Sequence, residues 1–226
     1  MPLSVVAYAS DESYADLVAR LRERFRDREI RPYTFSFPHK QATGDVRFRA
    51  TELLSGTLMP LLTDMVEKKT AVLASAADRE VRRADYGEIL LDADRSRRTI
   101  TVQYATPVMV QAMGGTLPFP VVPYVFAGYG EVWDAFSDVR LPRPAVEAAT
   151  FVRVADFKIS CAATPFGTGG QGWVTLEMEK GRTEEEIGLL NALVDFAFYC
   201  GTGVHTEEGL GQTRKIGPRR PSISRG

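Results

Sequence analysis

Near the C-terminal end of the chain, an apolar run is followed by four glycines in two pairs: Gly201 and Gly203, then Gly209 and Gly211. Glycine tolerates positive φ and allows main-chain N–H groups to approach a ligand closely, as in loops that hold phosphates. His205 lies between the pairs, and Arg214 and Lys215 follow them. The spacing therefore predicts a backbone cradle for an anionic ligand.

Two familiar nucleotide-binding fingerprints do not fit this loop. The dinucleotide motif requires a glycine where Thr206 stands, and a strand before the loop where a helix is expected. A Walker-type loop is also absent. A simpler alternative is that Gly201 caps the helix and the other glycines make a turn. Because a cap accounts for only one glycine of the four, we favour the cradle.

The charge of the chain is distributed unevenly. The formal net charge is -1 and the pI about 6.2, which alone do not indicate nucleic-acid binding. Arginines outnumber acids between Arg20 and Arg31, and the stretch from Arg214 to the end holds basic residues and no acid. We expect two basic patches. The alternatives are a solvated helix face with local ion pairs, and a disordered tail over residues 218–226.

Composition sets the outer limits. A chain of 226 residues, 44% of them hydrophobic, can bury the core of one large or two small domains. Cys161 and Cys200 are isolated in apolar runs, which predicts small core residues in a reducing compartment. With His39 and His205 as the two histidines, we expect no metal site and no cofactor. Without a recognisable membrane span or leader, a cytoplasmic location is expected.

Hydrophobic periodicity predicts a repeated unit. The first half should contain a helix over Tyr14–Phe25, strands over Tyr33–Phe37 and Val46–Ala50, a helix over 54–65, and a strand near Tyr86–Asp92. Arg47 and Arg49 alternate with apolar residues, so their side chains should face away from the core. Pro60 should kink or shorten the second helix.

The second half repeats this order. We expect strands over Thr99–Tyr104, Thr150–Ser160, Trp173–Glu179 and Gln212–Ile216, and a helix around Tyr124–Phe136. Residues 168–172 should form a turn. A capping box of Thr183 and Glu186 should start the last helix, which would bury Ala197 and Phe198.

Each half therefore has the β-α-β-β-α-β pattern, which predicts an α+β protein of tandem ferredoxin-like, RRM-like domains. The domains are expected at 1–97, and at 98–217 with the glycine-rich loop 201–211. The boundary should lie within Ala93–Arg98. This architecture also serves RNA-recognition modules.

Four segments carry a resemblance to a known family. The run Phe196–Gln212 resembles the glycine-rich loop of the CRISPR-associated endoribonucleases that cut precursor CRISPR RNA within its repeats, members of the repeat-associated RNA-binding (RAMP) superfamily. Arg31–Phe37 resembles that family's early strand, and Tyr104–Pro107 and Gln171–Val174 are more weakly similar. The resemblance implies two ferredoxin-like domains with RNA on a basic face between them.

The N-terminal end departs from the family pattern. Tyr8–Arg22 resembles the family's first helical region, which would leave residues 1–6 too short for the preceding strand. Alternatively, Leu3–Tyr8 is that strand and the match is shifted. The periodicity fits both alternatives.

The reaction implied by the resemblance is RNA cleavage without metal, in which the ribose 2′-hydroxyl attacks the adjacent phosphorus and gives a 2′,3′-cyclic phosphate. Many members have a histidine at the position that aligns with Arg22, and arginine is a poor base. Three alternatives follow: a site of Arg22 and Arg24, a site of His39 and Lys40, or binding without cutting.

We expect a repeat-specific endoribonuclease, with a non-catalytic RNA-binding subunit of a CRISPR effector complex as the alternative. A ferredoxin-like domain for another anionic ligand is a third possibility. The expected partners are precursor and mature CRISPR RNA, and other effector subunits in the alternative, with no membrane and a monomeric or homodimeric state. The expected RNA contacts are Gly201, Gly203, His205, Gly209, Gly211, Arg214, Lys215, Arg47 and Arg49.

Overall fold

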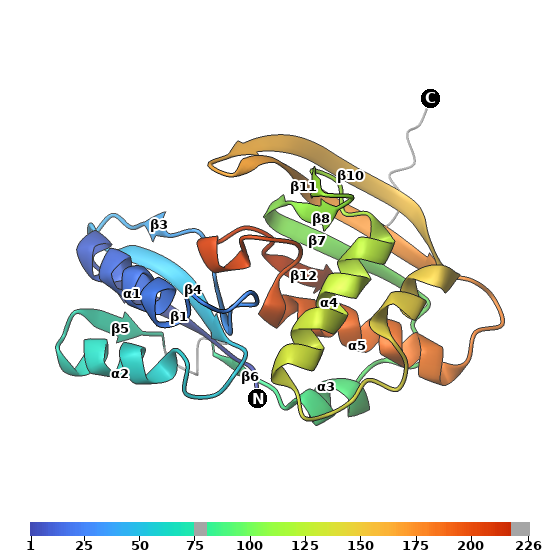
Figure 1. Ribbon diagram of the computed structural model, residues 1–226, viewed down its shortest axis with the longest axis horizontal. Helices are drawn as coiled ribbons and strands as arrows, with labels where there is room; N and C mark the ends of the chain where they lie inside the picture. The colour runs from blue at the N-terminus through green and yellow to red at the C-terminus, as the bar shows by residue number, and fades with distance from the viewer. Residues whose placement is uncertain (75–80, 218–226) are drawn as a thin grey trace.

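The computed structural model describes residues 1–74 and 81–217, and it contains two antiparallel sheets that lie beside each other (Figure 1). The first sheet has the order β2-β4-β1-β5, with β3 paired to β4 and β6 paired to β1. The second sheet has the order β10-β11-β7-β12, and β8 and β9 form a separate hairpin. The two four-strand orders are equivalent, and in each half a helix follows the first and the third of these strands. The predicted α+β fold of tandem ferredoxin-like units is confirmed.

The N-terminal half begins with a strand. Its elements are β1 Leu3–Ala9, α1 Asp11–Arg24, β2 Tyr33–Phe35, β3 His39–Lys40, β4 Val46–Glu52, α2 Met59–Glu67, β5 Ala71–Leu73 and β6 Arg82–Arg83. The first strand is thus present, and the alternative that placed it at Leu3–Tyr8 is correct. Ser10 directly follows β1 and caps α1, because its side chain accepts a hydrogen bond from Ser13 N. As predicted, Pro60 shortens α2, because it lies in the helix's first turn.

The segment Tyr86–Leu91 is the helix α3, so the strand predicted near Tyr86–Asp92 is wrong. Asp85 and Glu88 form a capping box that starts this helix. The strands β5 and β6 take the place of the predicted strand, and both pair with β1. Tyr86 and Ile89 pack in the core of the second half. The domain division at 97 and 98 stays a prediction.

The C-terminal half contains most of the core. Its elements are β7 Thr99–Val108, β8 Val110–Ala112, β9 Gly115–Leu117, α4 Val122–Phe136, the 3-10 helix η2 Ala145–Phe151, β10 Val152–Thr164, β11 Gly167–Met178, α5 Glu184–Cys200, the 3-10 helix η3 Thr206–Glu208, and β12 Thr213–Ile216. The capping box of Thr183 and Glu186 is confirmed at the start of α5. The buried face of this helix packs with α4 behind the second sheet.

Residues 168–172 do not form a turn. They lie within β11, and the hairpin between β10 and β11 turns at Pro165 and Phe166. The glycines serve close packing instead, because a Cβ at Gly172 would lie 1.9 Å from the carbonyl oxygen of Lys158. The pairing of β11 with β7 shifts register at this point.

One prediction about burial was wrong, and a second was right only in part. Cys161 is exposed, because it lies on the part of β10 where the side chains are mostly exposed on both faces, whereas Cys200 is buried as expected. Phe198 is only partly buried: it packs against the core of the second half, and its ring also contacts Arg49 in the first sheet. Among the described residues, no helix is long and apolar enough to cross a membrane. The basic tail predicted at 218–226 lies outside the described residues.

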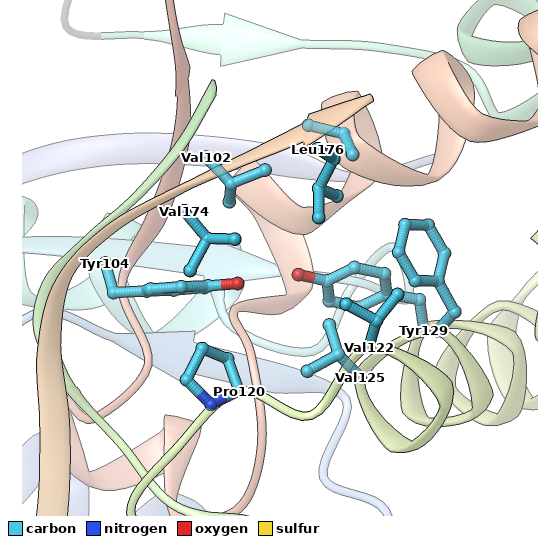
Figure 2. A pocket seen from close by; sticks show the side chains of 10 residues that line it. Val102, Tyr104, Pro120, Val122, Val125, Tyr129, Val174 and Leu176 are labelled. Carbon is cyan, nitrogen blue, oxygen red and sulfur yellow. The ribbon is translucent and has the colours of Figure 1, made fainter. Parts of the chain in front are cut away.

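A small pocket lies inside the core of the second half (Figure 2). The hydroxyl groups of Tyr104 and Tyr129 point toward each other across it, and the other labelled side chains are apolar. Burial raises the pKa of both tyrosines above its usual value. Because none of the lining residues carries a charge, this pocket is a feature of the core and offers nothing to an anionic ligand.

Candidate functional site

The face of the first sheet opposite its helices carries polar and basic side chains. Cross-strand pairing places His39 beside Arg47, and Arg47 beside Tyr8. The neighbouring positions Val46 and Phe48 are buried in the core with α1 and α2, so Arg47 and its partners lie on the other face. The prediction that Arg47 and Arg49 face away from the core is confirmed.

His39 and Lys40 point to opposite faces, because they are adjacent in a strand. Lys40 forms an ion pair with Asp11 at the start of α1, with 2.9 Å between Nζ and Oδ2. The Asp11 carboxylate raises the pKa of Lys40 through this hydrogen bond. The side chains of the predicted site of His39 and Lys40 therefore point away from each other, and the catalytic role of these residues stays a prediction.

Phe198 joins the first sheet to α5. The guanidinium carbons of Arg49 and Arg82 each lie 4.4 Å from the centroid of the Phe198 ring. Arg49 also donates a hydrogen bond to the Gln212 side chain, whose Nε2 donates to the Phe35 carbonyl at 2.7 Å. We name the group Arg49, Arg82, Arg214 and Phe198 the arginine seam.

The arginine seam carries uncompensated positive charge. Burial, together with the charges of Arg82, Arg214 and Arg47, lowers the pKa of Arg49 to about 10. Arg214 donates from Nε to the neutral side chain of Gln103 at 2.8 Å. Within the described residues, none of Arg49, Arg82 and Arg214 forms an ion pair with a carboxylate. Such a site is suited to an anionic ligand.

Lys215 lies apart from this seam. It is on the helix side of β12, where its Nζ pairs with Asp195 at 2.9 Å. The predicted contact of Lys215 with RNA stays a prediction.

The glycine loop, residues 201–211, lies between the two sheets (Figure 1). The φ angles of its four glycines are +73°, +81°, +93° and +65°, so the expected positive values are confirmed. The N–H groups of Thr202, Val204 and Gly211 donate to protein carbonyls at 2.8–2.9 Å. A Cβ at Gly203 would lie 2.1 Å from the Met109 carbonyl oxygen. The glycines thus allow close backbone packing, and a phosphate cradle stays a prediction.

A buried chain of hydroxyl groups supports the glycine loop. The Tyr129 hydroxyl lies 2.6 Å from Oγ1 of Thr202, which lies 2.6 Å from Oγ1 of Thr213. The Thr213 hydroxyl donates to the Gly211 carbonyl at 2.7 Å. This chain ties the loop to α4 and to the start of β12.

His205 contacts the hairpin of β10 and β11. Its ring stacks on that of Phe166, with 4.1 Å between the centroids and an interplanar angle of 13°. Its φ of 61° is in the left-handed region. The predicted role of His205 in phosphate contact stays a prediction, and the structure assigns its ring a stacking contact.

Arg22 meets the glycine loop. Its Nη2 donates to Oε2 of Glu208 in η3, and this hydrogen bond raises the pKa of Arg22. The Tyr33 hydroxyl is buried and has no hydrogen-bond partner in the part of the chain that the structure describes. Burial first, and then the charge of Glu207, raise the pKa of Tyr33 to about 12. We name Arg22, Glu208 and Tyr33 the Arg22 cluster.

Arg24 and Lys40 lie away from this cluster. Arg24 donates to the Thr57 carbonyl at 3.4 Å, on the α2 side of α1. Lys40 is beside Asp11, eleven residues before Arg22 on the same helix. An α-helix rises about 1.5 Å per residue, so these two helix positions are roughly 16 Å apart. Of the four candidate catalytic residues, only Arg22 contacts the glycine loop in the described structure.

Spacing and periodicity indicated no site role for Glu208, Arg82 or Phe198. Glu208 could have been noticed as an acid in a loop expected to bind an anion. The adjacent pair Arg82 and Arg83 is a basic signal in a segment for which no element was predicted. Phe198 was placed in the core because its spacing fits the apolar face of α5.

Comparisons with known proteins agree with this architecture. The fold is that of a tandem ferredoxin-like protein, and a family model for the CRISPR-associated endoribonuclease Cas6 matches residues 102–213, which include the second sheet's central strands and the glycine loop. The family model covers just under half of the chain, and it confirms the resemblance of the chain to the CRISPR RNA-processing endoribonucleases.

Solved structures share the fold over nearly the whole chain. The "Cas6 (TTHA0078) product complex" matches with a TM-score of 0.75 and 20% identity, over 96% of this chain and 100% of that one. The "Cas6 (TTHB231) product complex" matches with a TM-score of 0.72 and 21% identity, with the same coverage. "Thermus thermophilus Cas6 (TTHB231)" matches with a TM-score of 0.70 and 21% identity, over 96% and 98%. No curated protein matches the chain.

Proposed function

We propose that this chain binds the repeats of precursor CRISPR RNA along the arginine seam and cuts them without metal. The attacking group is the ribose 2′-hydroxyl, and the products are a 2′,3′-cyclic phosphate and a 5′-hydroxyl. The observation that carries the proposal is a set of three arginines, Arg49, Arg82 and Arg214, that have no carboxylate partner among the described residues, in a chain whose net charge is -1. Phosphates of an RNA strand would supply the missing negative charge.

The surroundings of the seam suit a flexible strand. Tyr8 and Arg47 are neighbours on the open face of the first sheet, where an aromatic ring and a cation can contact a base and its phosphate. The hydrogen bond between Arg49 and Gln212 lies where that face meets the second sheet. An RNA strand that crosses from the first sheet to the second would therefore pass the glycine loop.

Arg22 is the group that we assign to the reacting phosphate. Arginine stays protonated at ordinary pH and presents several N–H donors, so it can stabilise the extra negative charge that develops on the phosphoryl oxygens. The exposed fraction of its side chain is 55%, which leaves the guanidinium accessible to RNA.

The deciding experiment incubates the full chain with repeat RNA in EDTA, beside a matched RNA with a 2′-deoxy nucleotide at the scissile position. Cutting of the ribose substrate alone, with a cyclic phosphate end, is the expected result. Tight binding of both RNAs without cutting would instead support the non-catalytic RNA-binding subunit. That alternative is favoured by Arg22, which stands where the resemblance places a histidine. Absence of binding would overturn both functions.

The partners follow from the same proposal. We propose that the mature guide RNA stays bound, that other effector subunits associate with that complex, and that the protein acts in the cytoplasm as a monomer or homodimer. Sedimentation of the chain with and without RNA measures the oligomeric state.

A further inference from the structure

Among the residues that the structure describes, Glu208 is the one carboxylate in direct contact with Arg22. It lies in η3, within the glycine loop, and the exposed fraction of its side chain is 19%. A carboxylate can accept a proton, which a guanidinium cannot do at ordinary pH. We infer that Glu208 is the general base of the cleavage reaction and that Arg22 holds the reacting phosphate beside it. This inference rests on the proposed function.

The backbone fixes Glu208 in place. Its N–H donates to the His205 carbonyl at 3.0 Å, and the next residue, Gly209, has a φ of +93°. A Cβ at Gly209 would lie 2.8 Å from the backbone nitrogen of Phe37, so η3 packs closely on the chain that follows β2. A group held in this way is already oriented for proton transfer.

The groups around Glu208 favour this assignment. Arg22 contacts it from α1, and Glu207 adjoins it in η3. The charge of Glu208 adds to the effect of burial in raising the pKa of Tyr14 in α1 and of Tyr33 in β2. Arg22 uses Nη2 for Glu208, and within the described residues it makes no other hydrogen bond. Its remaining donors can hold a phosphate oxygen while Glu208 accepts a proton from the neighbouring ribose.

An oxygen of Glu208 takes the proton of the 2′-hydroxyl, and the 2′-oxygen forms a bond to phosphorus. The bond from phosphorus to the 5′-oxygen breaks, and that oxygen takes a proton from water. Glu208 then returns its proton to the hydroxide that remains. General base catalysis of this kind contributes about 100- to 10,000-fold in rate.

The two histidines are placed less well for this task. The ring of His205 stacks on Phe166, and His39 is on the open face of the first sheet beside Arg47. In the described structure, neither histidine makes a hydrogen bond through its ring to Arg22 or to Glu208.

The test is single-turnover cleavage of repeat RNA at saturating protein. E208Q should cut at least about 100-fold more slowly than the unaltered chain, because it removes the base. Its RNA affinity should be equal or higher, because a negative charge beside Arg22 is lost. E207Q is the matched control, with the same charge change one residue away, and should cut within about threefold of the unaltered chain, as expected for a residue without contact to the reacting groups.

A second variant separates catalysis from structure. E208A should also be slow, and added formate should restore part of its rate, because a small carboxylate can occupy the vacated space. E208Q, whose amide fills that space, should not respond to formate. A merely structural role for Glu208 predicts no rescue in either variant.

Several results would overturn the inference. Cutting by E208Q within about fivefold of the unaltered rate would exclude Glu208 as the base, since that loss is far below the range for a general base. Loss of cutting in H205A, together with normal cutting by E208Q, would assign the base to His205. If the unaltered chain does not cut at all, the proposed function fails and the role of Glu208 fails with it.

Discussion

The guanidinium carbon of Arg49 lies 4.4 Å from the centroid of the Phe198 ring, which joins β4 of the first sheet to the end of α5. An aromatic face attracts a cation without neutralising it. Arg82 stacks on the same ring at the same distance. The structure therefore holds two arginines in fixed positions while leaving their charge available to a ligand.

Replacing Phe198 with leucine should weaken the contact between the two halves. Leucine keeps apolar bulk but has no aromatic face, and a cation–π contact contributes about 0.5–1 kcal/mol at an exposed site and about 2 kcal/mol when it is desolvated. We expect F198L to lower the free energy of unfolding by about 1–3 kcal/mol for the two contacts. Urea denaturation measures this, with F157L as control, because Phe157 is exposed, its ring contacts Phe119, and it makes no cation–π contact with an arginine among the described residues. Equal losses in both variants would contradict the assignment.

Removing charge from the arginine seam should weaken RNA binding with a reduced dependence on salt. R82Q and R214Q should each lower the slope of log affinity against log salt by about 0.7–1, because each removes one phosphate contact. R143Q is the control, since Arg143 lies near three carboxylates at 3.6–3.8 Å. Titration of labelled repeat RNA at several salt concentrations gives the slopes. A slope unchanged in both seam variants would remove the seam from the RNA path.

Replacing Tyr129 with phenylalanine should destabilise the support under the glycine loop. The change removes the hydroxyl that lies 2.6 Å from Thr202 Oγ1, which should cost about 1–2 kcal/mol. Y124F is the matched control, because the Tyr124 hydroxyl makes no hydrogen bond among the described residues. Chemical denaturation measures both variants. A loss in Y124F as large as in Y129F would show that the hydroxyl chain is unimportant.

Alanine substitutions at Gly203 and Gly114 should distinguish the cost of backbone strain from the cost of steric overlap. Both have a φ near +80°, but a Cβ at Gly203 would lie 2.1 Å from the Met109 carbonyl oxygen, and at Gly114 nothing lies within 4 Å. G114A should cost about 1–2 kcal/mol from backbone strain alone. G203A should cost at least about 2 kcal/mol more, because the loop or the Met109 backbone must shift. G203A should also bind RNA more weakly, and similar losses in the two variants would refute the close-packing role.

The sequence was sufficient to predict the repeated fold and most of its helices. Two local signals were correct. The capping box of Thr183 and Glu186 indicated the start of α5, and the alternation of Tyr33 and Phe35 with polar residues indicated β2. The segment Tyr86–Leu91 was assigned as a strand because its apolar residues fit both periods over so short a length. The capping box of Asp85 and Glu88 was the missed signal.

The contacts between the two halves could not be predicted in this way. The hydrogen bond between Arg22 and Glu208 joins residues 186 positions apart, and periodicity contains no information about such pairs. Phe198 has the spacing of a core residue, although it contacts Arg49 and Arg82 across the seam. His39 and Lys40 were grouped by adjacency, whereas the pleat of β3 separates their side chains.

The stacking of His205 on Phe166 has a mechanical consequence. The hairpin of β10 and β11 is tethered near its tip to the loop that contains Glu208, three residues from His205. A ligand that displaces the hairpin would therefore also displace the glycine loop, and with it the contact between Glu208 and Arg22. Displacement of the Phe166 ring by a few ångströms would change the position of the Glu208 carboxylate relative to α1.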